Sequence, residues 1–178
     1  MAGRLWISLW FILTAPLMLW DAGFCLMRPR SMVGGDLHWI WAFYEFYGDV
    51  DHVYGVKAFE DGEGFANAAA VLNVIENIFG ILYLTTTHLL PSPLAPLAGY
   101  TGSAMTLSKT LLYVSQEYFC GFCAIGHNSV AGMVGYWVVP NVAWITISGL
   151  IMYHLGKDIV RSLRVTSTRV TSGRVKCE

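Results

Sequence analysis

The sequence predicts an all-α membrane protein, a four-helix transmembrane bundle with a long non-cytoplasmic loop between its first and second helices. Three observations predict this class: the composition, four long apolar stretches and an uneven distribution of charge. Of the 178 residues, 55% are hydrophobic and 13% are charged, whereas soluble domains carry about 25% charged residues. The chain therefore has too little polar surface for a soluble domain. Its net charge of −1 provides no basic field for nucleic acid.

Four stretches are long and apolar enough to cross a bilayer, which takes about 20 residues. They run from about Leu5 to Met27, Phe65 to Leu90, Leu97 to Phe119 and Val130 to Leu155. A secretory signal peptide is the alternative for the first stretch, because Arg4 precedes its apolar run. The run is longer than a signal peptide and lacks a clear small-x-small cleavage site, so a membrane helix is favoured.

The charges outside these stretches differ in sign. The loop from Arg28 to Gly64 contains three basic and seven acidic residues, whereas the segment after Leu155 contains six basic and two acidic residues. The positive-inside rule therefore predicts that both termini are cytoplasmic and that the acidic loop faces the lumen or exterior. We expect a membrane domain over residues 1–160 and a basic, disordered cytoplasmic tail over 161–178.

Four ionisable residues lie within the apolar stretches: Asp21, Glu76, Lys109 and Glu117. Each costs at least ~2.5 kcal/mol in the hydrocarbon, so each needs a reason to be there. One reason is pairing, for example of Lys109 with Glu76 or Asp21, which fastens the helices together. The other is chemistry, because carboxyl groups in apolar surroundings keep their protons near neutral pH and suit acid/base catalysis on a lipophilic substrate.

Neutral polar residues accompany these groups. Asn73 lies three residues before Glu76 on the same helical face, and Asn77 follows directly. The second stretch therefore has a polar stripe near its middle. Asn141 and Trp144 are three residues apart on the last stretch and project from the same side.

Two further motifs lie beside the predicted spans. Cys120 and Cys123 form a C-x-x-C, and no βαβ pattern surrounds it, so a structural disulfide or two inert thiols are favoured over a redox pair. A metal site with His127 lacks a fourth ligand at suitable spacing. The aromatic run 39–44 is most simply an interfacial element, and it could equally roof a cavity.

Four runs of residues, taken together, are similar to a known family. They are WAFYEFYGD at 41–49, VIENI at 74–78, the run at 112–122 from Leu-Tyr through Glu117 to Gly-Phe, and PNVAW at 140–144. Their order and spacing, from about Trp10 to Ile159, resemble the emopamil-binding protein family. This EXPERA group includes sterol Δ8-Δ7 isomerases and the sigma-2 receptor.

The resemblance implies a four-helix endoplasmic-reticulum protein whose cavity opens to the lipid and binds sterols and cationic amphiphiles. In the isomerases a second-span carboxylate works with acid/base residues on the first span, and an asparagine and an aromatic residue on the last span complete the pocket. Glu76, Asn141 and Trp144 match these positions, and the aromatic ring stabilises a carbocation by cation–π attraction.

The first span departs from the isomerase pattern. The histidine and glutamate of the isomerases correspond to Met18 and Ala22 here, and Asp21 is more like the aspartate of the sigma-2 branch. The acid/base pair of the sterol isomerases is therefore not reproduced on this span. A pair of carboxyl groups still suffices for double-bond migration, epoxide opening or cation-type cyclisation, so terpenoid or polyketide substrates of secondary metabolism are open alternatives.

The leading hypothesis is therefore a cofactor-free isomerase or cyclase in which Asp21 and Glu76 exchange protons with a lipophilic substrate. The expected substrate-binding residues are Asn73, Asn77, Lys109, Glu117, Asn141 and Trp144. For Lys109 and Glu117 the sequence leaves a second role open, which is to cap the bundle. The sequence contains no nucleotide loop, serine elbow or metalloprotease helix, and no metal is expected. The alternatives are a non-catalytic sterol-binding protein of sigma-2 type and a structural membrane subunit. Family members can dimerise, so the resemblance also suggests a homodimer, whereas the sequence itself does not indicate the oligomeric state.

Overall fold

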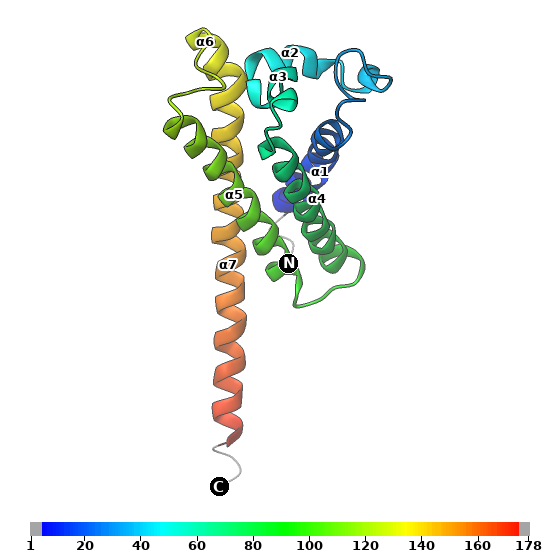
Figure 1. The fold of residues 1–178 in the computed structure, drawn as a ribbon. Helices are drawn as coiled ribbons and strands as arrows, with labels where there is room; N and C mark the ends of the chain where they lie inside the picture. Colours follow the sequence, from blue (N-terminus) through cyan, green and yellow to red (C-terminus); the bar gives the residue numbers. More distant parts are fainter. Residues whose placement is uncertain (1–4, 175–178) are drawn as a thin grey trace.

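The computed structural model describes residues 5–174, with side chains described for residues 5–165. Of these residues 79% are in helices and none are in strands, which confirms the all-α prediction. The elements in chain order are α1 (Leu5–Leu26), η2 (His38–Ile40), α2 (Phe43–Val50), η3 (His52–Tyr54), α3 (Val56–Glu60), α4 (Phe65–Leu84), η4 (Thr85–Leu89), α5 (Ala95–Phe119), α6 (Val130–Met133), η5 (Val134–Val138) and α7 (Val139–Arg174) (Figure 1).

Three helical segments within the described residues are long and apolar enough to cross a membrane. They are Leu5–Leu26, Phe65–Leu89 and Val130–Val165. These three agree with the predicted spans because the length of an apolar run is a local property of the sequence. The helix α5 has 25 residues, long enough for a span, but its serine, threonine, glycine and charged residues make it less apolar.

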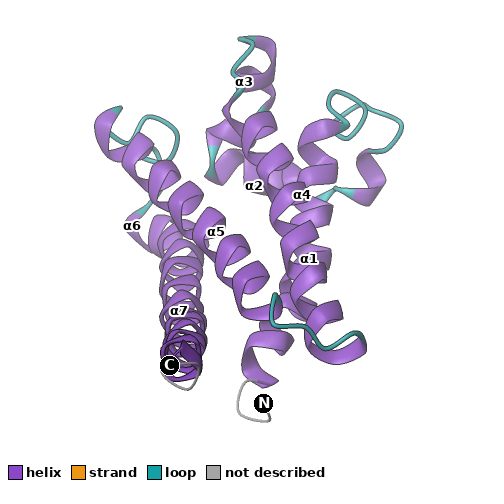
Figure 2. Cartoon of the chain, turned by 90° about the horizontal axis from the view of Figure 1, so that it is seen from below, coloured by secondary structure: helices purple, strands orange, loops and turns teal. Residues whose placement is uncertain are grey.

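The long helices pack around α5. It lies between α4 on one side and α7 on the other, and α1 packs against α4 (Figure 2). Small residues on α5 permit this close packing. A Cβ atom on Gly99 would lie 2.6 Å from Leu155 Cδ1 on α7 and 2.7 Å from Tyr83 Cδ2 on α4. Gly99 therefore lets α5 approach both neighbours at one point.

Two apolar clusters occupy opposite ends of the bundle. One includes Trp41, Tyr44 and Trp137 at the end near α2 and α3. The other includes Ile7 and Ile151 at the opposite end. Most of the buried polar residues of the long helices lie between these clusters, whereas Ser8 and Glu117 lie near the two ends. Those between the clusters include Thr14, Asn73, Glu76, Asn77, Ser103, Thr106, Thr110 and Ser148. The fold thus encloses a polar layer between two apolar ones.

The predicted polar loop is a folded cap over residues 27–64. Four short helices, η2, α2, η3 and α3, cover one end of the bundle (Figure 1). The Arg28 guanidinium anchors the cap by donating to Asn67 Oδ1 of α4 at 2.6 Å, and Ser31 Oγ donates to the carbonyl of Phe24 on α1 at 2.6 Å. The first of these contacts joins residues 39 positions apart, so local patterning could not predict it.

The C-terminal segment differs from the expected disordered tail. The helix α7 continues to Arg174, and residues 175–178 lie outside the described residues. Residues 157–174 contain no proline and a single glycine, Gly173. Because extending a formed helix is far easier than nucleating one, the apolar part of α7 can propagate helix into this basic segment.

Candidate functional site

A cluster of polar side chains from α1, α4 and α5 lies in the middle polar layer. Asp21 of α1 is held at both carboxylate oxygens. Tyr44 Oη donates to its Oδ1 at 2.6 Å, and Asn73 Nδ2 donates to its Oδ2 at 2.9 Å. The Tyr44 ring stacks on Phe24 with 4.0 Å between ring centroids, and this stacking fixes the hydroxyl over Asp21. Burial and the Asp21 charge raise the pKa of Tyr44 well above its usual value, so Tyr44 remains a donor.

Glu76 of α4 forms the second half of the cluster. It is 3% exposed, and Lys109 Nζ of α5 lies 2.9 Å from each of its carboxylate oxygens. Thr106 Oγ1, also on α5, donates to Glu76 Oε2 at 2.8 Å. The ammonium therefore compensates the charge of this carboxylate, which would otherwise be very unfavourable at such depth.

Asn73 connects the two carboxyl groups. Its amide nitrogen donates to Asp21, while its amide oxygen accepts a hydrogen bond from Lys109 Nζ. A continuous hydrogen-bonded chain thus runs from Tyr44 through Asp21, Asn73 and Lys109 to Glu76. Such a chain joins two ionisable groups that lie on different helices.

Two small cavities adjoin this chain. One, of about 70 Å³, is lined by Asn73 and Lys109 together with the aromatic rings of Tyr54, Phe65 and Tyr113. The other, of about 20 Å³, is lined by Glu76, Thr106, Asn77, Trp10 and Trp144 among others. Lys109 borders the first cavity and Glu76 the second, so their ion pair separates the two.

The smaller cavity places an aromatic pair beside Glu76. The rings of Trp10 and Trp144 meet edge to face with 5.1 Å between centroids, and both line this cavity. Ser103 Oγ, which is also buried there, has no hydrogen-bond partner among the described residues. The cavity is therefore lined by a carboxyl group, a hydroxyl without a described partner and two indole rings.

The structure brings together most but not all of the residues selected from the sequence. Asp21, Asn73, Glu76 and Lys109 form one cluster, and Trp144 and Asn77 line the adjoining cavity. Asn77 donates to the backbone carbonyl of Asn73 at 2.9 Å. Asn141 donates instead to the carbonyl of Trp137 on its own helix at 2.8 Å and lines neither cavity, because the rotamer that meets this carbonyl keeps its amide on α7.

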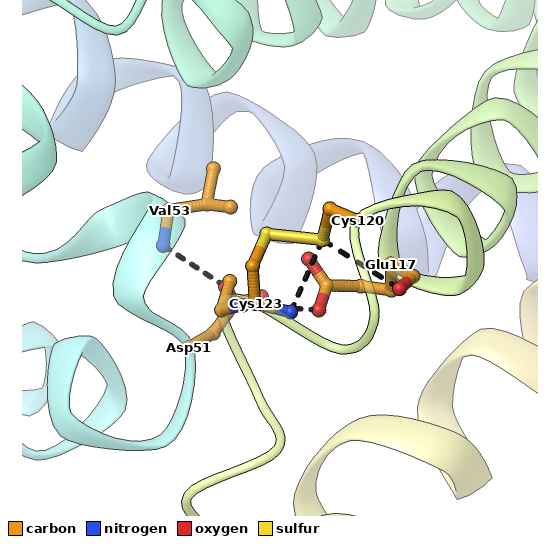
Figure 3. The surroundings of a disulfide bond; sticks show 6 residues. Asp51, Val53, Glu117, Cys120 and Cys123 are labelled. Atoms are coloured by element: carbon orange, nitrogen blue, oxygen red, sulfur yellow. Dashed lines mark hydrogen bonds between the residues drawn. A yellow bond between two sulfur atoms is a disulfide. The ribbon is translucent and has the colours of Figure 1, made fainter.

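Glu117 belongs to a different location from the one expected. It lies eight residues after Lys109, which is about 12 Å along the helix axis. It is fully buried, and its Oε2 accepts from the Ala124 backbone N–H at 3.2 Å. The expectation that it lines the same pocket as Glu76 is therefore not met. Its neighbours are Cys120 and Cys123, which form a disulfide (Figure 3), one of the two alternatives favoured from the sequence.

The same region holds a carboxyl group that the sequence did not single out. Asp51, at the start of η3, is fully buried, and its Oδ1 accepts a hydrogen bond from the Val53 N–H at 3.1 Å (Figure 3). Its Oδ2 has no hydrogen-bond partner among the described residues, and the same is true of Glu117 Oε1. Burial raises the pKa of Asp51 to about 7; the Val53 N–H opposes this rise, and the charge of Glu117 adds to it. Because the two cysteine sulfurs are bonded to each other, they are not free to act as thiolate ligands beside these carboxyl groups.

Sequence reasoning missed Tyr44, Thr106 and Trp10 as members of the site. Tyr44 belongs to the aromatic run 39–44. The sequence leaves two roles open for this run, an interfacial element and the roof of a cavity, and different members take each role. Trp41 and Tyr44 are buried and cover the bundle, with Trp41 Nε1 donating to the Trp20 carbonyl at 2.8 Å. Trp39 is 77% exposed, as an interfacial residue would be.

The comparisons with known proteins found no match to this chain among family models, curated proteins or solved structures. The chemistry of the polar cluster therefore rests on its geometry.

Proposed function

We propose that this protein is a membrane-embedded, cofactor-free enzyme that moves protons on a lipophilic polycyclic or polyene substrate, as an isomerase or cyclase. The observation that carries the proposal is the hydrogen-bonded chain that links Asp21 to Glu76 through Asn73 and Lys109. The resemblance to the emopamil-binding protein family supports the same class of reaction.

The charges of the cluster suit such a reaction. Two carboxylates and one ammonium leave one uncompensated negative charge, and burying a net charge is strongly unfavourable. One proton neutralises the cluster, and it can reside on Asp21 or on Glu76. One carboxyl group then serves as the acid and the other as the base. The positive charge of Lys109 stabilises whichever of the two is ionised.

The small cavity beside Glu76 suits the intermediate. Protonating one carbon of a double bond creates a carbocation, and the faces of Trp10 and Trp144 stabilise positive charge by cation–π attraction. The carbon next to the cationic centre, on the side away from the protonated carbon, then loses a proton to the other carboxylate. This step completes a double-bond migration with no net consumption of protons. In an epoxide substrate the same acid would protonate the oxygen as its C–O bond breaks.

The substrate would reach this cluster from the bilayer. The cavity of about 70 Å³ lies between α4 and α5. A polycyclic substrate is several times larger than either cavity, so the helices must separate or the cap must shift when it binds. Exposed apolar residues on the outer faces, such as Leu13, Ile78 and Leu112, form the surface across which a lipophilic molecule would move.

The same surface supports α5 as a fourth span. Leu97, Leu111 and Leu112 of α5 are each more than 40% exposed, which is favourable in lipid and unfavourable in water. With four spans both termini are cytoplasmic and the cap faces the lumen, and the family resemblance suggests the endoplasmic reticulum.

A non-catalytic sterol-binding protein is the second candidate. The observation that favours it is the internal pairing of the cluster, since Lys109 already neutralises Glu76 and both oxygens of Asp21 are occupied. In that case a ligand amine would displace Lys109 or one of the hydrogen bonds to Asp21, and no bond in the ligand would change.

Untargeted metabolite profiling of an expression host tests the proposal. The wild-type chain is compared with Glu76→Gln, and Glu60→Gln on the exposed surface of α3 serves as the matched control. A product made by the wild type and the control, and lost with Glu76→Gln, is expected. If no product forms but a cationic amphiphile binds and Asp21→Asn abolishes that binding, the second candidate replaces the first; without product or binding, both are wrong.

A further inference from the structure

A groove between α5 and α7 lies at the end of the bundle opposite the cap. Its volume is about 730 Å³. Tyr100 forms its wall on α5, packed against α7 at Gly156, where an added Cβ would be 3.3 Å from the Tyr100 ring. The wall on α7 is formed mainly by Met152, Tyr153, Lys157, Val160, Arg161 and Arg164.

The basic residues of the groove share one face of α7. Lys157, Arg161 and Arg164 are spaced four and three residues apart, which places them on adjacent turns of the same side. Lys157 is held by Tyr153, whose hydroxyl accepts from its Nζ at 2.6 Å and whose ring centroid is 4.3 Å away. Asp158 is turned by about 100° from Lys157 and by about 60° from Arg161 around the helix, so it lies at the edge of this face, where the three basic side chains outnumber it.

The position of these cations matches the membrane surface. The apolar segment Val130–Val165 has 36 residues, about 54 Å of helix, whereas the hydrocarbon layer is about 30 Å thick. The part beyond the buried Ile151 and Leu155 therefore extends past the hydrocarbon. Lys157 is the first basic residue there, followed within two turns by Arg161 and Arg164. Tyr100 and Tyr153 lie at the same level, as aromatic residues at a bilayer interface do.

We propose that this groove binds a phospholipid with an anionic headgroup. The two guanidinium groups and the ammonium match a phosphate, since arginine donates in pairs to phosphate oxygens. Met152 and the Tyr100 ring, on the hydrocarbon side of Lys157, offer an apolar wall to an acyl chain beside it. A free phosphate would use only the basic part of the groove, so the combination of the two parts points to a lipid.

Native mass spectrometry of the full chain, released from detergent, tests this site. Dioleoylphosphatidylserine is titrated against dioleoylphosphatidylcholine, and retained lipid is counted for the wild type and for Arg161→Gln/Arg164→Gln. The matched control is Arg30→Gln/Lys57→Gln, which removes the same charge from exposed residues of the cap. We expect the wild type and control to retain phosphatidylserine preferentially, and the groove variant to bind it about tenfold or more weakly.

A competition experiment separates the headgroup from the whole lipid. Glycerophosphoserine, which carries the headgroup without acyl chains, should displace little phosphatidylserine. Equally strong displacement would show that the groove recognises a phosphate alone and would overturn the assignment to a lipid. Equal retention by the wild type and the groove variant, or equal loss in the control, would overturn the site itself.

Discussion

Lys109 is the residue on which the charge balance of the polar cluster depends. Replacing it by methionine keeps most of the side-chain volume but leaves Glu76 buried without its cation. Removing one member of a buried ion pair is strongly destabilising, so we expect Lys109→Met to lower the free energy of unfolding by about 3 kcal/mol. Thermal unfolding of the detergent-solubilised protein, followed by intrinsic tryptophan fluorescence, measures the change.

The double variant Lys109→Met/Glu76→Gln is the control for this interpretation. It removes both charges, so the protein should recover a large part of the stability lost in the single variant. A double variant that is as unstable as the sum of the two single variants would show that the residues do not act as a pair. The double variant should be inactive whether or not its stability recovers, because it lacks Glu76, one of the two proposed acid/base groups.

Asp51 predicts a pH dependence of stability. Its pKa is raised from 3.8 to about 7 in the folded protein, so the folded state binds a proton more tightly than the unfolded state. The stabilisation is complete below about pH 4 and is lost as the pH rises through 7. We expect the melting temperature of the wild type to fall over this interval and that of Asp51→Asn to fall less.

The other groups around Asp51 provide the controls for the pH experiment. Glu117 faces it, and part of the rise in its pKa comes from the Glu117 charge. Glu117→Gln should therefore move the loss of stability toward lower pH, whereas Glu60→Gln on the exposed surface of α3 should leave the profile unchanged. The same profile in Asp51→Asn as in the wild type would contradict the assignment.

At the scale of the helices, Gly99 determines how closely α5 approaches its neighbours. A valine there would place its Cβ within 2.7 Å of atoms on Leu155 and Tyr83. Overpacking of this kind typically costs about 1–3 kcal/mol, so the melting temperature of Gly99→Val should fall. Gly149→Ala on α7 is the control, because a Cβ there meets nothing within 4 Å and alanine favours the helix. Equal melting temperatures for both variants would contradict this account.

The sequence predicts some helices well because their signal is local. The first stretch, expected from Leu5 to Met27, forms α1 from Leu5 to Leu26, and the second ends within one residue of the predicted Leu90. The cap could not be predicted in this way. Its short helices are positioned by contacts such as Tyr44 with Asp21, which lie 23 residues apart, and polar composition alone does not encode such contacts.

The same difference between local and tertiary signals applies to the residues of the site. An ionisable residue within an apolar run is conspicuous, so Asp21, Glu76 and Lys109 could be selected from the sequence, and the structure places them in one cluster. Asp51 could not be selected, because it is one of seven acidic residues in a polar segment, where acidic residues are ordinary. Only the fold shows that it is buried.

At the scale of the whole molecule, the side of the membrane on which α7 ends depends on whether α5 crosses the bilayer. With α1, α4, α5 and α7 all spanning, the C-terminus lies on the same side as the N-terminus. If α5 lay outside the membrane, the three remaining spans would place the C-terminus on the side of the cap. The charge of the segment after Leu155, with six basic and two acidic residues, favours the first arrangement.

Glycosylation mapping in microsomes distinguishes these arrangements. The sequence contains no Asn-x-Ser/Thr acceptor, so an acceptor introduced at one place is the only one in the chain. We expect an acceptor inserted at the exposed Gly62 turn of the cap to be glycosylated, and one appended after Glu178 to remain unmodified. Glycosylation at both places would show that α5 does not cross the bilayer. Lys109 would then lie outside the hydrocarbon, and its ion pair with Glu76 would not be an ion pair within the membrane.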